Sequence, residues 1–387
     1  MRKGLFRGNT VAPITQDTLT PPKVCVVTKN EEHGKLYMGA LRRQFDISLF
    51  ADASQAGDEI AQARPDVILV ETEITQGGRI GWLSPDWARF KGKTPSFVFI
   101  AKKGEGFGDL MPRFGKGGRY LTWPVSAKSV TDAILDLISG EAEKAWDDLP
   151  EKHKKPLKMT VAEYQSISDH IAKGEPIDCN AASDSCAPLA EAVKQGEHHS
   201  LLHMVQSHHN YTYVHSMRVA TLLTLFGHAI GMKGDDLIIL SAGGLLHDVG
   251  KMITPPKILD KPGKLSEDEW PIMKNHVIES ITLLDRATDL TKGARIIAEQ
   301  HHEKLDGSGY PLGLKSTELN ELARMSVIAD IFGALTDRRS YKPAFPSEKA
   351  FAILEDMNGA VDQNMLALFK DIFLSTQPEE MSAQLAG

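Results

Sequence analysis

The first 140 residues carry short apolar runs separated by segments with helical spacing. Three of these runs have the length and the Val, Ile and Phe content of buried strands: Lys23–Val27, Asp66–Val70 and Ser96–Ile100. A further run, Arg119–Leu121, precedes Trp123-Pro124. Leu36–Phe45 and Ser129–Ile138 instead have the apolar spacing of helices. Strands that alternate with helices predict a parallel sheet covered by helices on both faces.

From about residue 201 the apolar residues recur at helical spacing, and polar residues share their faces. His215 lies four residues before Val219 and therefore on the apolar face of its helix. Ser266–Glu269 has the sequence of a capping box and begins a helix that carries His276 on its apolar side. Asp330 lies within an apolar stripe, where a carboxylate without a partner is costly to bury. The pattern predicts an all-α domain with polar side chains in its interior.

The segment between these two regions has neither pattern until Leu189, where helical spacing resumes. Glu141–Lys158 is highly charged, and Gly174–Pro188 is rich in turn formers and small residues. We therefore expect a multidomain chain, with an α/β domain over residues 22–140, a linker and connector helix over 141–200 and a helical domain over 201–387.

Composition supports this division and excludes several classes of protein. A length of 387 residues suits two domains plus a connector, and 42% hydrophobic with 25% charged residues is ordinary for a globular chain. The net charge of -7 and the absence of a Lys/Arg block argue against a general nucleic-acid binder. We find neither a signal-peptide apolar region nor a run long enough for a membrane span. The chain has three cysteines, Cys25, Cys179 and Cys186. This odd number, without metal-binding or redox spacing, favours a protein of the reducing cytoplasm.

Histidines are concentrated in the helical region, where eleven of the fourteen lie between His198 and His302. His301 and His302 are adjacent and precede the turn Asp306–Pro311, and His247-Asp248 follows an apolar run. This mixture of imidazoles and carboxylates suits Fe, Mn or Zn better than Mg or Ca. A single inward histidine is more often a hydrogen-bonded core residue than a ligand. Five helices that offer polar ligands to one interior favour a metal site, and one with more than one ion.

The order of elements in the N-terminal region, with its Tyr120-Leu-x-x-Pro124 ending, resembles the receiver domain of two-component response regulators, a flavodoxin-like fold. A receiver has a phosphorylatable Asp after its third strand, acidic metal ligands after its first, a switch Ser or Thr, and a Lys before the final Pro. Other residues stand at those places here: Glu71, Lys29-Asn30, Ala101 and Trp123. The resemblance therefore implies a pseudo-receiver that docks a partner or dimerises without phosphorylation. A different α/β domain with the same strand order is the alternative.

The region from Leu201 to Phe373 resembles the HD-GYP domain, a branch of the HD metal-phosphohydrolase superfamily that hydrolyses the second messenger cyclic di-GMP. The matching segments are Tyr211–Ala220, Leu245–Lys251, Ile258–Leu265, His276, His301–Leu314 and Arg324–Lys342. Another type of HD phosphohydrolase is the alternative, but it does not explain the Asp306-Gly-Ser-Gly-Tyr-Pro311 turn.

The resemblance implies a role for each matching residue. Seven would be metal ligands: His215, His247, Asp248, His276, His301, His302 and Asp330. Asp248 would bridge two cations, and two cations roughly 3.5–4 Å apart can share a hydroxide and bind phosphate oxygens. The catalytic residues would be Asp248 and Lys251. Lys251, Arg339 and Lys342 would bind the phosphodiester, and Gly307 and Gly309 would let the backbone turn beside the substrate. The product would be linear pGpG, with further cleavage to GMP left open.

Departures from the family pattern refine this expectation. Some members bind a third metal through a Glu four residues before the first ligand histidine, where this chain has Tyr211, so we expect a binuclear site. By resemblance, two divalent transition-metal ions are expected, with iron first and manganese second. Ser280 replaces a usual Gly. The remaining histidines of the helical region match no ligand, and we expect them on solvated helix faces: His198, His199, His203, His208, His209 and His228.

Two functions from different classes remain at this point. The first is an active cyclic di-GMP phosphodiesterase, favoured because all seven ligands persist. The second is a non-catalytic cyclic di-GMP receptor or scaffold that binds signalling proteins, such as GGDEF proteins, through the Gly-Tyr-Pro surface. In either case we expect a cytoplasmic protein with cyclic di-GMP as a partner, and a homodimer is a further hypothesis.

Overall fold

The structure is a computed structural model that describes residues 21–42, 44–51, 60, 62–71, 94–104, 107, 118–259, 261, 263–337 and 344–376. Its contacts divide the chain into two compact units, and the boundary lies between Lys144 and Ala145. Among the described helices, none is both long and apolar enough to cross a membrane.

The N-terminal unit contains a five-stranded parallel sheet in the order β2-β1-β3-β4-β5. The strands are β1 Lys23–Val27, β2 Asp46–Phe50, β3 Val67–Glu71, β4 Ser96–Lys102 and β5 Gly118–Trp123. This is the flavodoxin-like order, so the expected α/β class and parallel sheet are confirmed, while the receiver identity stays a prediction. The sequence pattern did not predict β2, which is an edge strand with two exposed residues and none fully buried.

Two described helices pack on one face of this sheet: α1 Glu31–Leu41 and α4 Ala127–Ala145. Helix α1 begins five residues before the predicted segment because the Asn30 side chain accepts hydrogen bonds from the N–H groups of Glu32 and His33. Tyr37 of α1 and Ile134 of α4 are buried in one apolar cluster with Val26 and Leu69 of the sheet. The opposite face of the sheet packs around Phe97 and Phe99.

Glu71, at the place of a receiver's phospho-acceptor, is buried at the end of β3. Its carboxylate accepts hydrogen bonds from Thr28 Oγ1 at 2.5 Å and Tyr37 Oη at 2.7 Å. His33 Nδ1 lies 2.6 Å from the same carboxylate, and the His33 ring stacks on Trp123 with centroids 3.7 Å apart. Both carboxylate oxygens therefore already have partners within the unit.

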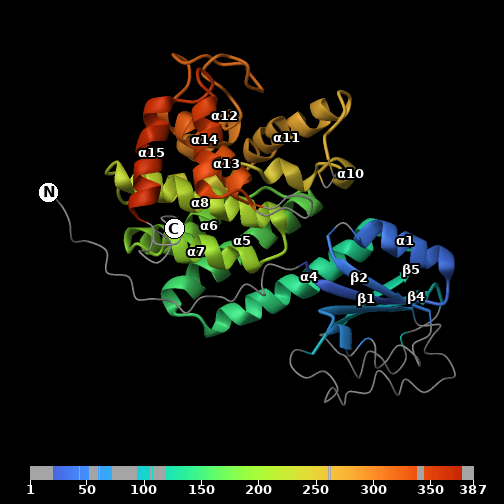
Figure 1. The fold of residues 1–387 in the computed structure, drawn as a ribbon. Helices are drawn as coiled ribbons and strands as arrows, with labels where there is room; N and C mark the ends of the chain where they lie inside the picture. The colour runs from blue at the N-terminus through green and yellow to red at the C-terminus, as the bar shows by residue number, and fades with distance from the viewer. Residues whose placement is uncertain are drawn as a thin grey trace. The chain divides into compact units, whose positions relative to one another are not determined.

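The second unit is built of helices, as predicted. Its helices are α5 Glu151–Lys173, α6 Cys179–Lys194, α7 His198–Met204, α8 Tyr211–Ala229, α9 Asp235–Leu246, α10 Pro256–Leu259, α11 Glu269–Leu284, α12 Lys292–Gln300, α13 Glu321–Thr336, α14 Ser347–Asp356 and α15 Gln363–Ser375. Short 3₁₀ turns cover Trp146–Asp148, Val205–Ser207 and Val249–Met252. Helix α8 is buried on nearly every side and lies between α6 and the group α13–α15 (Figure 1).

The segment predicted as a connector contributes to this helical core. Leu157 of α5 and Leu189 of α6 share one apolar cluster with Leu222 of α8. Gly174–Pro188 is largely helical from Cys179 onwards, because the Asp178 side chain accepts hydrogen bonds from two N–H groups of the first turn. The small residues of α6 allow it to pack closely on α9. All three cysteines are buried and free, consistent with a packing role.

Candidate metal centre

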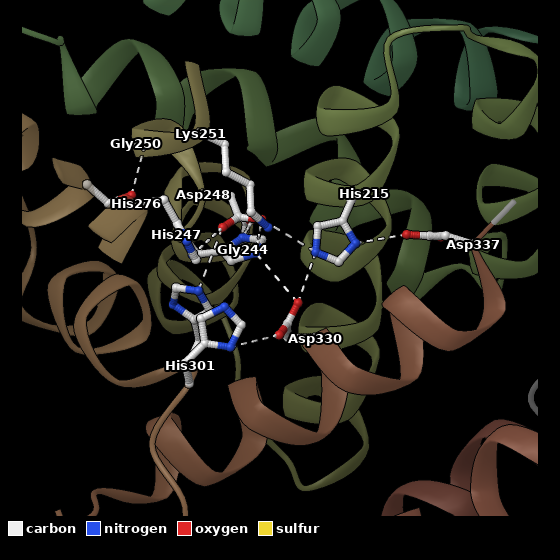
Figure 2. Close-up of polar contacts among 12 residues, drawn as sticks. His215, Gly244, His247, Asp248, Gly250, Lys251, His276, His301, Asp330 and Asp337 are labelled. Carbon is white, nitrogen blue, oxygen red and sulfur yellow. Dashed lines mark hydrogen bonds and ion pairs between the residues drawn. The ribbon is translucent and has the colours of Figure 1, made fainter. Parts of the chain in front are cut away.

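The seven predicted ligands come from five parts of the helical unit and meet in its interior (Figure 2). His215 lies in the second turn of α8, His247-Asp248 follow α9, and His276 lies in α11. His301-His302 follow α12, and Asp330 lies in α13. Six of these residues are buried and His302 is partly buried. Three overlapping groups have ligand atoms within 4.8 Å of one another: His276/His301/His302, His215/His247/Asp330 and His247/Asp248/His301.

Asp248 lies at the centre of the cluster, and its two oxygens face different histidines. Oδ1 lies 3.2 Å from His276 Nε2 and 3.7 Å from His301 Nε2. Oδ2 lies 3.2 Å from His247 Nε2 and 3.6 Å from His215 Nε2. A carboxylate with one oxygen toward each of two histidine pairs has the arrangement needed to bridge two cations.

Asp330 is the second buried carboxylate of the cluster. Its Oδ1 lies 2.9 Å from His215 Nε2 and 3.9 Å from His247 Nε2, and its Oδ2 lies 3.6 Å from His302 Nδ1. A buried carboxylate needs a partner, and the partners of Asp330 are the imidazole rings of these histidines.

Three of the histidines are oriented by a carbonyl group of the preceding turn of their own segment. The Nδ1 atoms of His247, His276 and His301 lie 2.7, 2.6 and 2.9 Å from the carbonyl oxygens of Gly244, Met273 and Ala298. Each carbonyl belongs to the residue three positions earlier, so Nδ1 carries the proton and Nε2 has a free lone pair. All three Nε2 atoms, and Asp248 Oδ1, are buried without a hydrogen-bond partner. Buried nitrogen and oxygen lone pairs that accept no hydrogen bond are suited to bind transition-metal ions.

The electrostatic environment favours the metal-binding forms of Asp248, His301 and His302, whereas it favours the protonated form of His215. Burial opposes the charge of Asp248, but His247 and Lys251 outweigh it and hold its pKa well below the usual range. Burial and neighbouring imidazoles hold the pKa of His301 well below its usual value, and burial lowers the pKa of His302 to about 3. Burial also lowers the pKa of His215, but hydrogen bonds to Asp330 and Asp337 outweigh it and raise that pKa to about 9. In the metal-free protein a proton on His215 thus occupies a place suited to a cation.

Lys251 lies beside the cluster, one turn after Asp248. Its Nζ forms an ion pair with Asp248 Oδ2, and its side chain is 17% exposed. It therefore reaches both the buried carboxylate and the surface of the site. Arg339 and Lys342, the other predicted phosphate contacts, lie outside the described residues.

The segment that directly follows the Asp306–Pro311 turn is anchored by a buried carboxylate. Glu303 is fully buried and accepts hydrogen bonds from the N–H groups of Leu312, Gly313 and Leu314. Tyr310 of the turn stacks on His302 with ring centroids 4.7 Å apart. The turn therefore packs directly against a predicted metal ligand.

The two glycines predicted to line the site are needed for different reasons. Gly307 has φ +79°, in the left-handed region. A Cβ built at Gly309 would lie 2.5 Å from Glu303 Cα and 2.5 Å from Lys304 N, closer than real Cβ contacts. Gly309 is thus required by close backbone approach and Gly307 by backbone conformation.

Asp337 is a further residue of the site that the sequence analysis did not single out. It is buried after α13, and its Oδ2 lies 2.8 Å from His215 Nδ1 (Figure 2). Its Oδ1 pairs with Arg218 Nε. Its position within the matching segment Arg324–Lys342 was the available signal, but the sequence does not show that it is buried or which histidine it contacts.

The expectation that the other histidines lie on solvated helix faces is wrong for His198 and His208. His198 is 1% exposed and His208 is 7% exposed, while His199, His209 and His228 are partly buried. Only His203 is exposed. The short helix α7 packs on α8, and His198, its first residue, is buried next to His199.

Comparison with known families identifies the class of the helical unit. Residues 199–365 match the family model described as the HD domain. This region is therefore an HD domain, and similar curated proteins support its HD-GYP character. A 3′3′-cGAMP-specific phosphodiesterase of Vibrio cholerae is 40% identical over 171 residues, covering 44% of this chain and 37% of that protein. A cyclic di-GMP phosphodiesterase of Pseudomonas aeruginosa is 32% identical over 200 residues, covering 51% and 48%. A cyclic di-GMP phosphodiesterase response regulator of Xanthomonas campestris is 38% identical over 144 residues, covering 37% and 38%. The chain thus spans less than half the length of these relatives.

Proposed function

We propose that this chain is a metal-dependent phosphodiesterase that hydrolyses cyclic di-GMP to linear pGpG, and further to GMP if the linear product rebinds. The observation that carries the proposal is the convergence of five imidazoles and two carboxylates on one interior, with three buried Nε2 atoms left unpaired. The similarity of the HD domain to curated phosphodiesterases supports the reaction class.

The proposed cofactor is a pair of divalent transition-metal ions, iron first and manganese second, because imidazole and carboxylate donors suit these metals. Asp248 would contact both ions, since its Oδ1 and Oδ2 face different histidines. Tyr211 stands where a third ion would need a carboxylate, and its ring stacks near that of His215. When bound, such a pair lowers the pKa of a shared water and binds phosphate oxygens.

The protein's own contribution is to bind and orient the phosphodiester. Lys251 Nζ is close enough to the Asp248 carboxylate to hold an adjacent phosphate oxygen, and we assign it to substrate binding and to charge stabilisation during cleavage. Arg339 and Lys342 are proposed to bind the same phosphodiester. The turn with Gly307 and Gly309 is proposed to line the nucleotide side of the site, since Tyr310 stacks on His302.

A second substrate, 3′3′-cGAMP, is a candidate because a phosphodiesterase specific for it is 40% identical to this chain over 171 residues. The two cyclic dinucleotides share the phosphodiester ring and differ in one base. The metal cluster and Lys251 contact only the shared part in this proposal, so discrimination would fall to residues around the base.

The experiment is an initial-rate comparison of the full chain, purified without oxygen, on cyclic di-GMP and 3′3′-cGAMP, with products separated by chromatography. The proposal predicts pGpG from cyclic di-GMP, and loss of that product in a His301→Ala variant. Faster cleavage of 3′3′-cGAMP would move the assignment to the second substrate. Binding of cyclic di-GMP without any product from metal-loaded protein would instead support the receptor or scaffold function. The pseudo-receiver role, GGDEF partners and a homodimer stay predictions.

A further inference from the structure

We propose that Asp337 is a positioning residue for the metal centre, which fixes the proton of His215 on Nδ1 and so presents Nε2 to a metal ion. The inference rests on the proposed metal-dependent function. Asp337 directly follows α13, where its N–H donates to Gly333 O at 2.7 Å, and its side chain is fully buried.

The position of the Asp337 carboxylate is fixed by a buried arginine. Arg218 lies one turn after His215 on α8 and pairs through Nε with Asp337 Oδ1. Its guanidinium also donates to Leu202 O at 3.1 Å and to Thr336 Oγ1 at 2.9 Å. With Oδ1 held by Arg218, the remaining Oδ2 points at His215 Nδ1, 2.8 Å away.

This arrangement distinguishes His215 from three other histidines of the cluster. His247, His276 and His301 each bond a carbonyl from their own preceding turn. His215 instead depends on a charged side chain that follows the end of another helix, α13. A carboxylate partner on the far nitrogen fixes the tautomer and makes imidazole a stronger metal ligand. The ion bound by His215 and Asp330 would therefore be the one that depends on Asp337.

An asparagine at position 337 has nearly the same shape but different hydrogen-bonding capacity. An ionised carboxylate can form the ion pair with Arg218 through one oxygen and accept a hydrogen bond from His215 Nδ1–H through the other. An asparagine side chain has one acceptor oxygen and one NH₂ group. If the amide oxygen faces Arg218, the NH₂ group faces His215 Nδ1 and donates to it. The proton of His215 is then on Nε2, and this proton blocks metal binding at that atom.

The test is a Mn²⁺ titration of the metal-free full chain, with unbound Mn²⁺ measured by electron paramagnetic resonance. We expect Asp337→Asn to lower the affinity for one of the two ions by roughly 10–100-fold and to leave the affinity for the other ion close to that of the wild type. Asp337→Glu, which keeps two acceptor oxygens, should recover part of the loss. The matched control is Asp362→Asn: Asp362 also pairs with an arginine, Arg324, at 3.0 Å, but caps α15 away from the cluster. It should lower thermal stability and retain both ions.

Circular dichroism establishes that each variant is folded. If Asp337→Asn is not, the smaller Asp337→Ser, which lacks the charge, replaces it in the titration with the same expected loss. Wild-type Mn²⁺ affinity in these variants, or equal loss in Asp362→Asn, would overturn the inference and leave the proposed function standing. A wild-type protein that binds two ions but cleaves no cyclic dinucleotide would refute the proposed function alone.

Discussion

Replacing Gly309 by alanine tests whether the Asp306–Pro311 turn must sit at its observed place for catalysis. The new Cβ would lie 2.5 Å from Glu303 Cα and 2.5 Å from Lys304 N, against 3.4 Å or more in ordinary contacts. Since both neighbours are backbone atoms, the turn must shift by about 1 Å, a displacement that can lower a catalysed rate by about 10²-fold. Overpacking of this kind costs about 1–3 kcal/mol, which corresponds to a fall in Tm of roughly 2–12 °C for a unit of this size.

Gly307→Ala is the matched control in the same turn. Gly307 has φ +79°, so alanine there is strained by about 1–2 kcal/mol, but its nearest neighbours are the flexible Lys315 Cγ and Cε at 3.1 and 3.3 Å. We expect Gly309→Ala to lower kcat on cyclic di-GMP about 10²-fold and Gly307→Ala much less, at similar metal content and Tm. Steady-state kinetics, elemental analysis and calorimetry supply the measurements. Equal rate loss in both variants, or a wild-type kcat in Gly309→Ala, would refute the argument from steric contact.

Three further predictions concern the cluster, a buried histidine and the N-terminal unit. Asp248→Ala should lose bound metal and activity together while keeping its helices, by elemental analysis and circular dichroism; retained metal would contradict the bridging role. Burial, with the rings of His199 and His228, lowers the pKa of His198 from 6.5 to about 3, so the unfolded chain takes up a proton first as the pH falls. The free energy of unfolding should therefore decrease below about pH 6.5, by on the order of 3 kcal/mol at pH 4. Calorimetry of His198→Phe should show a smaller decrease over this pH range, whereas the exposed control His203→Gln should show the wild-type decrease. Acetyl phosphate should not modify the N-terminal unit, because both oxygens of Glu71 already accept hydrogen bonds; a stoichiometric phosphoryl adduct by intact mass would show otherwise.

The sequence predicted elements whose own residues carry a strong pattern. β1, β3 and β4 are continuous apolar runs because both faces of a central parallel strand are buried. β2 lies at the edge, where one side of the strand meets no neighbour in the sheet, and its alternation of Asp, Ser and apolar residues gave no comparable signal.

The candidate site divides in the same way. The ligands lie in compact motifs, such as His247-Asp248 and His301-His302, whose chemistry can be read from neighbouring residues. Asp337 could not be assigned, because its contact with His215 joins the end of α13 to α8 across 122 residues. Burial of His198 depends on how α7 packs, which local spacing does not specify.

The most direct test of the central claim is the rate of cyclic di-GMP cleavage as metal is returned to the metal-free full chain in known equivalents. Iron(II), added without oxygen, and manganese(II) are each titrated while bound metal and product are measured on the same sample. The account predicts that pGpG formation rises with the second bound equivalent and reaches its maximum at two ions per chain. A maximal rate with one ion or none, or no product at two bound ions, would contradict it.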